Sequence, residues 1–563
     1  MKNRITLMLL FSSLLLAIFL RFYKLGQVPN GLYRDETAIG YNSYSILTTG
    51  KDEYGQRAPL YFKSFGDYKL PVYVYVTAAT VKFFGLTPLA VRLPSAIFGV
   101  LTVLALYFLV KELTEDRLLS AVSSLLLAAT PWHIHYSRAA FEVSLSLFFF
   151  TAGGTLLIQA LTKNHRWKFL LGTLCFILSL YTYNLTRLLT PVLYLLFLVV
   201  YRKELKTLTT SEKLATIGLS AILLAPFVAT FTGSGGVASA QGTLITSSAA
   251  VQAQLLELRS YMIALPPVLA SLFFNRFILT FWQYLQHLAS YLSVTFLFLT
   301  GSPHGNHGIG NVGQFYLFEL PLIVLGIVAS LKQKGVSQLL LFWWFFAAVA
   351  IAALTREAPH ATRGFFLLVP VTVWAARGLM ITIQWLRTKT KRIQTILVSL
   401  MVLFALYNIL FYLFSYFVRF PVFYAKAWRS ADAQLVELLK QNGHNFDKII
   451  IDKQAGFVYT SLLFYAQYPA SDFQQTVKRA ADDSEGFSEV ISFGKYEFRD
   501  IDWPKDFAQP NTLLITTRER KPLEIPALAT FYYPQRPVVF AVKQEIVRYP
   551  TEETSYVAVA SRP

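Results

Sequence analysis

The sequence contains little cysteine. Its 563 residues include a single cysteine, Cys175, which lies inside an apolar run. A single cysteine excludes an intrachain disulfide and a cysteine-rich metal site, and its apolar surroundings favour no thiol chemistry. The cysteine content therefore gives no information about the cellular compartment.

Acidic residues are also scarce. The chain has 32 Asp and Glu against 51 Lys and Arg, which gives a formal net charge of +19. A nucleic-acid-binding protein concentrates its basic residues on one face or in one domain. Here they stand in short clusters between apolar runs, as expected for a membrane protein whose cytoplasmic loops carry excess positive charge. The charge therefore indicates membrane orientation, and we expect no nucleic-acid partner.

Apolar residues, by contrast, are abundant. Hydrophobic residues make up 54% of the chain, more than the roughly 45–50% of soluble proteins. A membrane-spanning helix needs about 17–25 residues, and we count eleven apolar runs near that length, within a range of eleven to thirteen. The sequence therefore predicts a multi-pass α-helical membrane protein. The runs are 5–22, 89–110, 118–135, 144–161, 168–184, 186–201, 214–231, 315–331, 336–354, 365–386 and 393–417.

Lys and Arg are distributed unevenly between the loops. The loops 111–117, 162–168, 202–213, 332–335 and 387–392 contain fifteen of them, whereas 131–143, 184–188 and 355–364 contain four. Because cytoplasmic loops carry the excess, we expect the N-terminus in the cytoplasm and, after an odd number of spans, the C-terminus outside the cell membrane. No small-residue cleavage site follows the first run, so we interpret it as an uncleaved helix.

Two stretches are harder to interpret. Residues 70–84 are apolar but short, and if they spanned the membrane the positive clusters would move outside. We therefore predict an amphipathic helix lying in the interface. Within the mixed region 232–314, which begins Gly233-Ser234-Gly235-Gly236, residues 273–299 form either an interfacial helix or a further hairpin.

The composition divides the chain into two predicted domains. Residues 1–419 form the transmembrane domain, whose first extracytoplasmic loop, 23–88, contains interfacial helices. Residues 420–563 regain charge and read as a soluble extracytoplasmic α/β domain. Its predicted elements are helices at Ala431–Gln441 and Val458–Tyr465 and strands at Lys448–Asp452 and Asn511–Thr517.

Two adjacent carboxylates, Asp35 and Glu36, follow the first apolar run. A carboxylate near a bilayer is costly unless it is paired, hydrated or chemically needed, so the pair is a candidate catalytic site. The alternative is that Asp35 only caps a helix from about Glu36 to Leu47, with Glu36 in its first turn. The pair alone leaves both interpretations open.

The other polar candidates lie in the predicted outside loops. Asp35 could act as a general base on an acceptor hydroxyl, and Lys69 could stabilise a phosphate leaving group. Each candidate also has a structural alternative. Lys69 could extend to lipid headgroups, Arg138 and Glu142 could pair along one helix, and His360 and Arg363 could be ordinary loop residues or a second phosphate clamp. His304 and His307 could bind a metal, but no third ligand is placed.

Four motifs occur in an order that carries family information. The Asp35-Glu36 pair is followed by Lys69-Leu70-Pro71, by Phe84-Gly85 with Arg92-Leu93-Pro94-Ser95, and by Ser137-Arg138 with Glu142 four residues further on. Over about residues 1–200 this order resembles the lipid-dependent glycosyltransferases of the GT-C superfamily, particularly the protein O-mannosyltransferases and the aminoarabinose transferase that modifies lipid A. The resemblance extends less strongly to about residue 417.

The resemblance implies a polyprenyl-phosphate-linked sugar as donor, bound from the membrane with its phosphate near Lys69. It implies Asp35 as the catalytic base. We add Glu36 and Glu142 as candidate further acids, and Tyr68, Arg138, His360 and Arg363 as candidate substrate-binding residues beside Lys69. Three departures from the family pattern are Tyr68 in place of a metal-liganding Glu, Leu70 in place of a first Pro, and Glu142 in place of Asp. No cofactor is required, although a divalent cation remains possible.

The expected function is therefore inverting transfer of a sugar to an extracytoplasmic hydroxyl on a lipid, glycan or protein. The alternative is a transporter or lipid flippase whose outside charges form a binding vestibule. Such proteins keep polar residues near the bilayer midplane and often contain internal repeats, and the sequence shows neither. A third possibility, a C-terminal receptor domain on a membrane anchor, leaves eleven spans unexplained.

Overall fold

Long apolar helices fill one of the two units into which the chain divides. The computed structural model describes residues 2–560 except 65–66, 164, 232–244, 246–248, 262–265, 334, 457, 484–486 and 533–553. The helical unit comprises Met1–Arg21, Ile97–Ser137 and Phe141–Tyr412. The mixed unit comprises Phe22–Ala96, Arg138–Ala140 and Leu413–Pro563.

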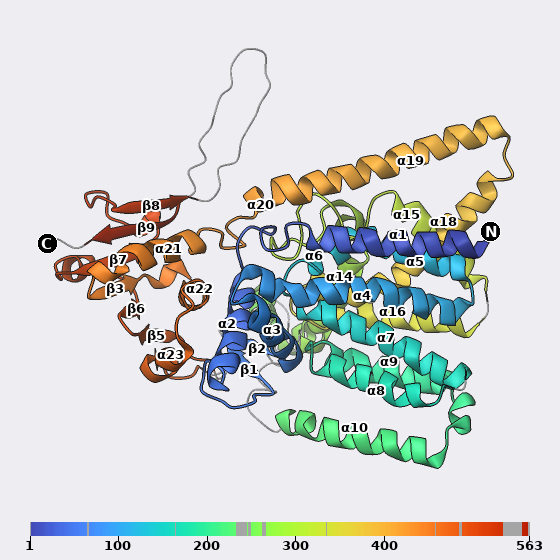
Figure 1. Ribbon diagram of the computed structural model, residues 1–563, viewed down its shortest axis with the longest axis horizontal. Coiled ribbons are helices and arrows are strands. Elements are labelled where there is room, and N and C mark those ends of the chain that lie inside the picture. Colours follow the sequence, from blue (N-terminus) through green and yellow to red (C-terminus); the bar gives the residue numbers. More distant parts are fainter. Residues whose placement is uncertain are drawn as a thin grey trace, which may run out of the picture. The chain divides into compact units, whose positions relative to one another are not determined.

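Each of the eleven predicted apolar runs overlaps a helix of at least 13 residues (Figure 1). Among the residues that the structure describes, seven helices are long and apolar enough to cross a membrane, and four apolar helices are shorter. The multi-pass helical architecture is therefore confirmed. The helices are α1 (Lys2–Phe22), α4 (Pro88–Thr114), α5 (Arg117–Ala129), α7 (Glu142–Thr162), α8 (Trp167–Leu180), α9 (Thr186–Val200), α10 (Thr210–Phe231), α15 (Glu319–Leu331), α16 (Val336–Ala353), α18 (Leu368–Leu386) and α19 (Lys391–Phe414).

One predicted run is broken in the structure. The run 118–135 was expected to be one helix, but α5 ends at Ala129 and α6 (Pro131–Tyr136) begins separately. Thr130 between them is extended, with φ −61° and ψ 126°, because a residue before proline is driven out of the helical region. The remaining short elements of this unit are η1 (Glu204–Thr207), α12 (Ala249–Ser260), α13 (Pro267–Phe273), α14 (Arg276–Tyr291), η3 (Thr295–Leu299), α17 (Ala361–Gly364) and η4 (Phe365–Leu367).

The stretch 273–299 contains one long helix, α14, followed by the single π-helical turn η3. A hairpin of two spanning helices is therefore wrong for these residues. The start of the predicted mixed region, Gly233-Ser234-Gly235-Gly236, lies outside the described residues.

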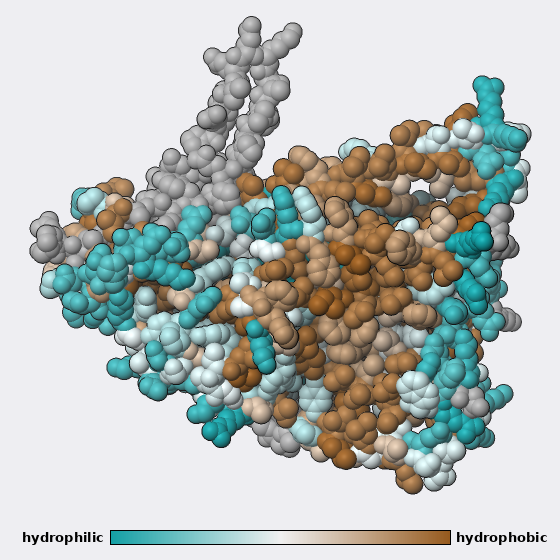
Figure 2. Space-filling view, in the orientation of Figure 1, coloured by the Kyte–Doolittle hydropathy of each residue, from teal (hydrophilic) through white to brown (hydrophobic). Residues whose placement is uncertain are grey.

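The surface of the helical unit is apolar along its helices. Figure 2 shows hydrophobic side chains over these helices and hydrophilic ones at the helix ends near the N-terminus. Leu7 on α1, Ile217 on α10 and Leu403 on α19 each expose more than 60% of their surface. Apolar surface on this scale is unfavourable in water, so its exposure fits burial in lipid.

Glycines bring α15 and α18 into backbone contact. A Cβ added at Gly326 of α15 would overlap the carbonyl oxygen of Trp374 on α18, and one added at Gly378 of α18 would overlap the carbonyl oxygen of Leu322 on α15. Small residues allow this close approach between membrane helices. The two glycines therefore set the distance between α15 and α18.

The mixed unit contains a seven-stranded sheet in the order β4-β5-β6-β3-β7-β9-β8. The central strand β3 runs parallel to β6 and β7, and the other pairings are antiparallel. All four predicted elements of this region are confirmed, as α21, β3, α22 and β7. The elements are η5 (Ser415–Arg419), α20 (Phe420–Phe423), α21 (Asp432–Asn442), η6 (Gly443–Asn445), β3 (Lys448–Ile451), η7 (Lys453–Ala455), α22 (Val458–Tyr465), α23 (Ala470–Thr476), β4 (Lys478–Arg479), β5 (Val490–Phe493), β6 (Tyr496–Phe498), α24 (Trp503–Asp506), β7 (Thr512–Thr516), η8 (Arg518–Arg520), β8 (Ala529–Tyr532) and β9 (Thr554–Ala560).

The predicted first loop contributes its own elements to the mixed unit. Helix α2 (Arg34–Thr49) and helix α3 (Pro71–Phe84) flank the hairpin of β1 (Phe62–Ser64) and β2 (Asp67–Lys69). The predicted helices of this loop are confirmed, and α3 covers the short apolar stretch 70–84. Their location at the membrane interface stays a prediction.

Replacing Gly326 by alanine should destabilise the helical unit, because the added methyl group forces α15 away from α18. We expect a loss of about 1–3 kcal/mol, typical of overpacking, measured as a lower melting temperature in detergent. The control is Gly218→Ala on α10, where nothing lies within 4 Å of the added Cβ. Equal melting temperatures for both variants would contradict the close contact.

Candidate active site

Asp35 lies in the first turn of α2 and faces Lys69. Helix α2 begins at Arg34, and its N-cap is Tyr33, whose side chain makes no capping hydrogen bond. The alternative that Asp35 serves as the helix cap is therefore wrong. Its Oδ1 instead lies 3.0 Å from the Nζ of Lys69. A carboxylate in the first turn also interacts favourably with the helix dipole.

The hairpin β1–β2 positions Lys69. Lys69 is the last residue of β2, pairs with Phe62 of β1, and is separated from α3 by Leu70 alone. Its side chain is 4% exposed, whereas that of Asp35 is 28% exposed. Successive strand residues point to opposite faces, and the ring of the preceding Tyr68 contacts Phe487, with ring centroids 4.9 Å apart.

Glu36, the neighbour of Asp35, is completely buried. Its Oε1 accepts hydrogen bonds from Nε of Arg92 at 2.9 Å and from the backbone N–H of Ala140 at 3.0 Å. Its Oε2 accepts a second bond from Arg92 at 3.0 Å. Both oxygens are therefore engaged in a bidentate ion pair, which is a strong and geometrically specific contact.

Arg92 uses all of its hydrogen-bond donors. Besides the two bonds to Glu36, it donates to the backbone carbonyls of Leu25 at 3.2 Å, Pro29 at 2.9 Å, and Gly31. These contacts satisfy the five N–H donors of a guanidinium group. Gly31 has φ +94°, and a Cβ there would overlap the carbonyl oxygen of Trp428. The loop before α2 is therefore held by hydrogen bonds from Arg92 and by close packing of Gly31 against the backbone of Trp428.

Arg138, a predicted phosphate ligand, is fully buried in the mixed unit. It donates to the carbonyl of Val28 at 3.0 Å, and its guanidinium lies 5.0 Å from the ring centre of Phe417 and 5.5 Å from that of Tyr416. Arg138 therefore also holds the loop that precedes α2. Its role in phosphate binding stays a prediction.

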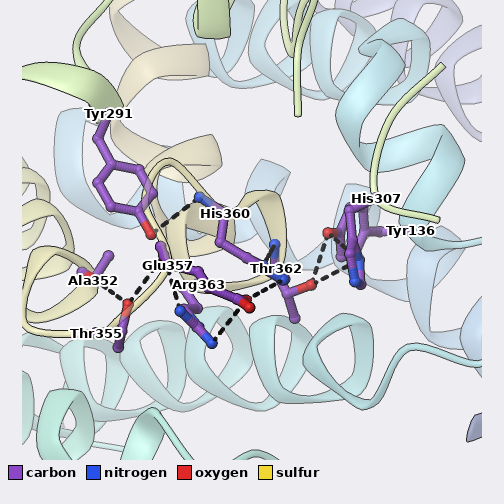
Figure 3. A network of polar contacts seen from close by, with 9 residues as sticks. All are labelled: Tyr136, Tyr291, His307, Ala352, Thr355, Glu357, His360, Thr362 and Arg363. Atoms are coloured by element: carbon purple, nitrogen blue, oxygen red, sulfur yellow. Dashed lines mark hydrogen bonds and ion pairs between the residues drawn. The ribbon is translucent and has the colours of Figure 1, made fainter. Parts of the chain in front are cut away.

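A second polar cluster lies in the helical unit, between the loop before α15 and the loop before α17 (Figure 3). Tyr136, His307 and Thr362 form a triangle with distances of 2.8 to 3.1 Å between hydroxyls and Nδ1. His360 accepts a bond from the N–H of Thr362 at 3.3 Å. Arg363 donates to the backbone carbonyl of Glu357 at 2.9 Å and contacts its carboxylate at 3.4 Å.

The histidines of this cluster lie close together. Ligand atoms of His304, Glu357 and His360 all lie within 4.8 Å of one another, so the structure offers a set of three metal ligands that includes one of the two predicted histidines. Burial lowers the pKa of His307 to about 3, helped by the neighbouring His135, His304 and Arg363. Burial likewise lowers the pKa of His360 well below its usual value, so both rings are neutral at neutral pH.

The structure brings some predicted residues together and separates others. Asp35, Glu36, Tyr68, Lys69 and Arg138 all belong to the mixed unit. The others, His304, His307, His360, Arg363 and Glu142, belong to the helical unit. Glu142 is partly buried in the first turn of α7, and its role stays a prediction.

Arg92 is the residue of this site that sequence reasoning did not assign. Its signal was present, because Arg92-Leu93-Pro94-Ser95 is one of the four ordered motifs. An arginine within an apolar run needs a partner in the folded chain, but the sequence does not identify Glu36, 56 residues earlier, as that partner.

Comparison with known families supports the resemblance. Residues 11–233 match the family described as dolichyl-phosphate-mannose-protein mannosyltransferase. No curated protein matches the sequence. Over these residues the predicted resemblance to the lipid-dependent glycosyltransferases is confirmed.

Solved structures share the fold at low sequence identity. ArnT from Cupriavidus metallidurans bound to undecaprenyl phosphate matches with a TM-score of 0.54 and 11% identity, over 98% of this chain and 97% of that one. The archaeal oligosaccharyltransferase AglB from Archaeoglobus fulgidus, in complex with an inhibitory peptide and a dolichol-phosphate, matches with a TM-score of 0.51 and 14% identity. That match covers 83% of this chain but only 64% of AglB, so the chain spans less than two thirds of its length.

Replacing Glu36 by glutamine should strongly destabilise the mixed unit, because it leaves the charge of Arg92 buried without its counterion. Breaking one partner of a buried ion pair costs about 3–5 kcal/mol, which should appear as a large fall in melting temperature and in folded yield. The control is Asp482→Asn, which breaks the exposed Lys63–Asp482 bridge of 3.0 Å and should leave the melting temperature nearly unchanged. A thermally unaltered Glu36→Gln variant would contradict this assignment.

Proposed function

We propose that the chain transfers a sugar from a polyprenyl-phosphate donor to an acceptor hydroxyl on the extracytoplasmic side of the cell membrane, with Asp35 as general base. The observation that carries this proposal is the contrast between the two adjacent carboxylates. Asp35 keeps 28% of its side chain exposed beside Lys69, whereas Glu36 is fully buried. Only the first can meet an incoming hydroxyl.

In the proposed step the Asp35 carboxylate takes the proton of the acceptor hydroxyl. The acceptor oxygen forms a bond to the anomeric carbon while the bond from that carbon to the phosphate oxygen breaks. The leaving electron pair stays on the polyprenyl phosphate. A single displacement of this kind inverts the configuration at the anomeric carbon, and it needs no nucleotide.

Lys69 has two roles in this proposal. Its ammonium group, 3.0 Å from Asp35, holds the carboxylate in one orientation. The same positive charge stabilises the negative charge that develops on the leaving phosphate, an effect that is stronger where water is largely excluded. The 4% exposure of the Lys69 side chain fits that requirement.

The remaining residues support the base from a distance. We assign Glu36 and Arg92 as positioning residues, because their ion pair fixes the first turn of α2 and the loop before it. Arg138 fixes the same loop through Val28. The role of Glu142 as a further acid, and those of Tyr68, His360 and Arg363 in substrate binding, stay predictions.

Replacing Asp35 by asparagine keeps the shape of the side chain but removes the base. With the native chain in detergent and an undecaprenyl-phosphate-linked sugar that it accepts, we expect kcat to fall at least about 10²-fold. Donor affinity should change little, because the positive charge of Lys69 remains. The readout is product formed per enzyme, followed with a labelled sugar.

Lys69→Gln should reduce kcat and weaken donor binding together. Lys63→Gln, which alters a lysine on the other strand of the same hairpin, serves as its control and should leave both parameters near the native values.

Full turnover by the Asp35→Asn variant, with native melting behaviour, would refute Asp35 as the base.

We also propose a divalent-cation site at His304, Glu357 and His360 in the helical unit. Two imidazoles and a carboxylate are a ligand set that suits Zn²⁺, and the short distances between their ligand atoms fit one ion. This set replaces the predicted His304–His307 pair, because Nδ1 of His307 faces the hydroxyls of Tyr136 and Thr362 at 3.1 Å. The catalytic step above involves none of these residues.

Equilibrium dialysis of the purified chain against Zn²⁺, followed by elemental analysis, tests this site. We expect one bound ion in the native chain and at least tenfold weaker binding in His304→Ala and Glu357→Gln. His307→Gln is the matched control and should retain the ion. No binding by the native chain, or an equal loss in all three variants, would exclude this ligand set.

A further inference from the structure

A cavity in the mixed unit lies at the carboxyl ends of the central parallel strands. Its volume is about 350 Å³, at the lower end of the range for small-molecule sites. Asp452 follows the last residue of β3, and Phe498 is the last residue of β6. In sheets with parallel strands, ligands bind preferentially outside the carboxyl ends of the strands.

Aromatic side chains form the wall of this cavity. Tyr459, Phe487 and Phe498 line it, and the rings of Tyr459 and Phe498 meet edge to face with centroids 6.2 Å apart. All three residues are less than 10% exposed. Ordered aromatic surfaces of this kind can contact the C–H face of a ring-shaped ligand.

Carboxylates supply most of the polar groups. Asp452, Asp483 and Glu489 line the cavity with one cation, Lys453, which pairs with Glu489 at 2.7 Å. Asp452 is held by Thr516 and Arg520, each at 2.9 Å. The lining thus carries more negative than positive charge, which favours ligands with hydroxyl donors and disfavours phosphates.

The cavity is joined to the hairpin that carries Lys69. Phe487 in the cavity wall contacts Tyr68, the residue before Lys69, with ring centroids 4.9 Å apart. On the same hairpin, Lys63 pairs with Asp482, the neighbour of the lining residue Asp483. A ligand in the cavity would therefore contact Phe487, whose ring packs against the residue next to the proposed catalytic lysine.

We infer that this cavity binds an uncharged saccharide ring, with the aromatic wall against its C–H face and the carboxylates accepting hydrogen bonds from its hydroxyls. The ring would belong to the acceptor, and this last assignment rests on the proposed function. The cavity would then select acceptors by their sugar content. The lipid-phosphate donor would be excluded from it by charge.

Saturation-transfer NMR on the full chain tests the inference, in a detergent without a sugar headgroup. The probes are the methyl α-glycosides of glucose, galactose, mannose and N-acetylglucosamine, each compared with its 6-phosphate. We expect at least one uncharged glycoside to bind and its phosphate to bind at least about tenfold more weakly. No signal from any glycoside, or equal binding of the phosphates, would overturn the inference.

Two conservative variants locate the binding. Asp483→Asn and Glu489→Gln should each weaken the bound glycoside about tenfold or more, as expected when a hydrogen bond to a charged group is lost. The control Glu497→Gln alters an ion pair of 3.0 Å with Lys448 on the same sheet. Glu497 does not itself line the cavity, so this variant should bind normally. Unchanged binding in both lining variants would place the saccharide elsewhere.

This binding test is separate from catalysis. If Asp35→Asn abolishes transfer but still gives the native glycoside signal, both proposals stand. If the glycoside fails to bind while Asp35→Asn loses transfer, the saccharide site is wrong and the proposed base is retained.

Discussion

The bidentate ion pair between Glu36 and Arg92 is the contact on which the candidate site depends. It joins the first turn of α2 to the start of α4, and the remaining Arg92 donors fix three carbonyls of the loop before α2. Removing two charges from water is expensive, and their attraction repays the cost only with good geometry and further hydrogen bonds. Here every donor and both acceptors are engaged, so this pair specifies one arrangement of the loop.

That arrangement explains how two neighbouring acids come to differ. Successive residues of a helix point about 100° apart, so α2 can bury Glu36 and leave Asp35 at its rim. With Glu36 anchored, the direction of Asp35 is no longer free. The hairpin then completes the site by placing Lys69 opposite Asp35. Of these two adjacent side chains, Asp35 carries the proposed chemistry and Glu36 anchors the helical turn.

The sequence could predict what depends on length and periodicity. The apolar runs gave the helices of the helical unit because a span requires a fixed length, and the Asp35-Glu36 pair was visible because acids are rare. It could not predict that Glu36 is anchored and Asp35 accessible, since this follows from Arg92, 56 residues away. Nor could it group His304 with Glu357 and His360. These residues belong to two loops far apart in the sequence, and no periodic pattern indicates that the loops meet.

The first loop and the C-terminal elements share one folded unit, and this changes how the role of residues 420–563 should be tested. Thr37 of α2 donates to Thr460 at 2.9 Å, and Gly40 lies so close to Phe464 that a Cβ would overlap its ring. A deletion of the C-terminal elements would therefore uncover the buried face of α2 and release Asp35. Loss of transfer after such a deletion would report collapse of the loop, so only point substitutions in the cavity can show whether these elements choose the acceptor.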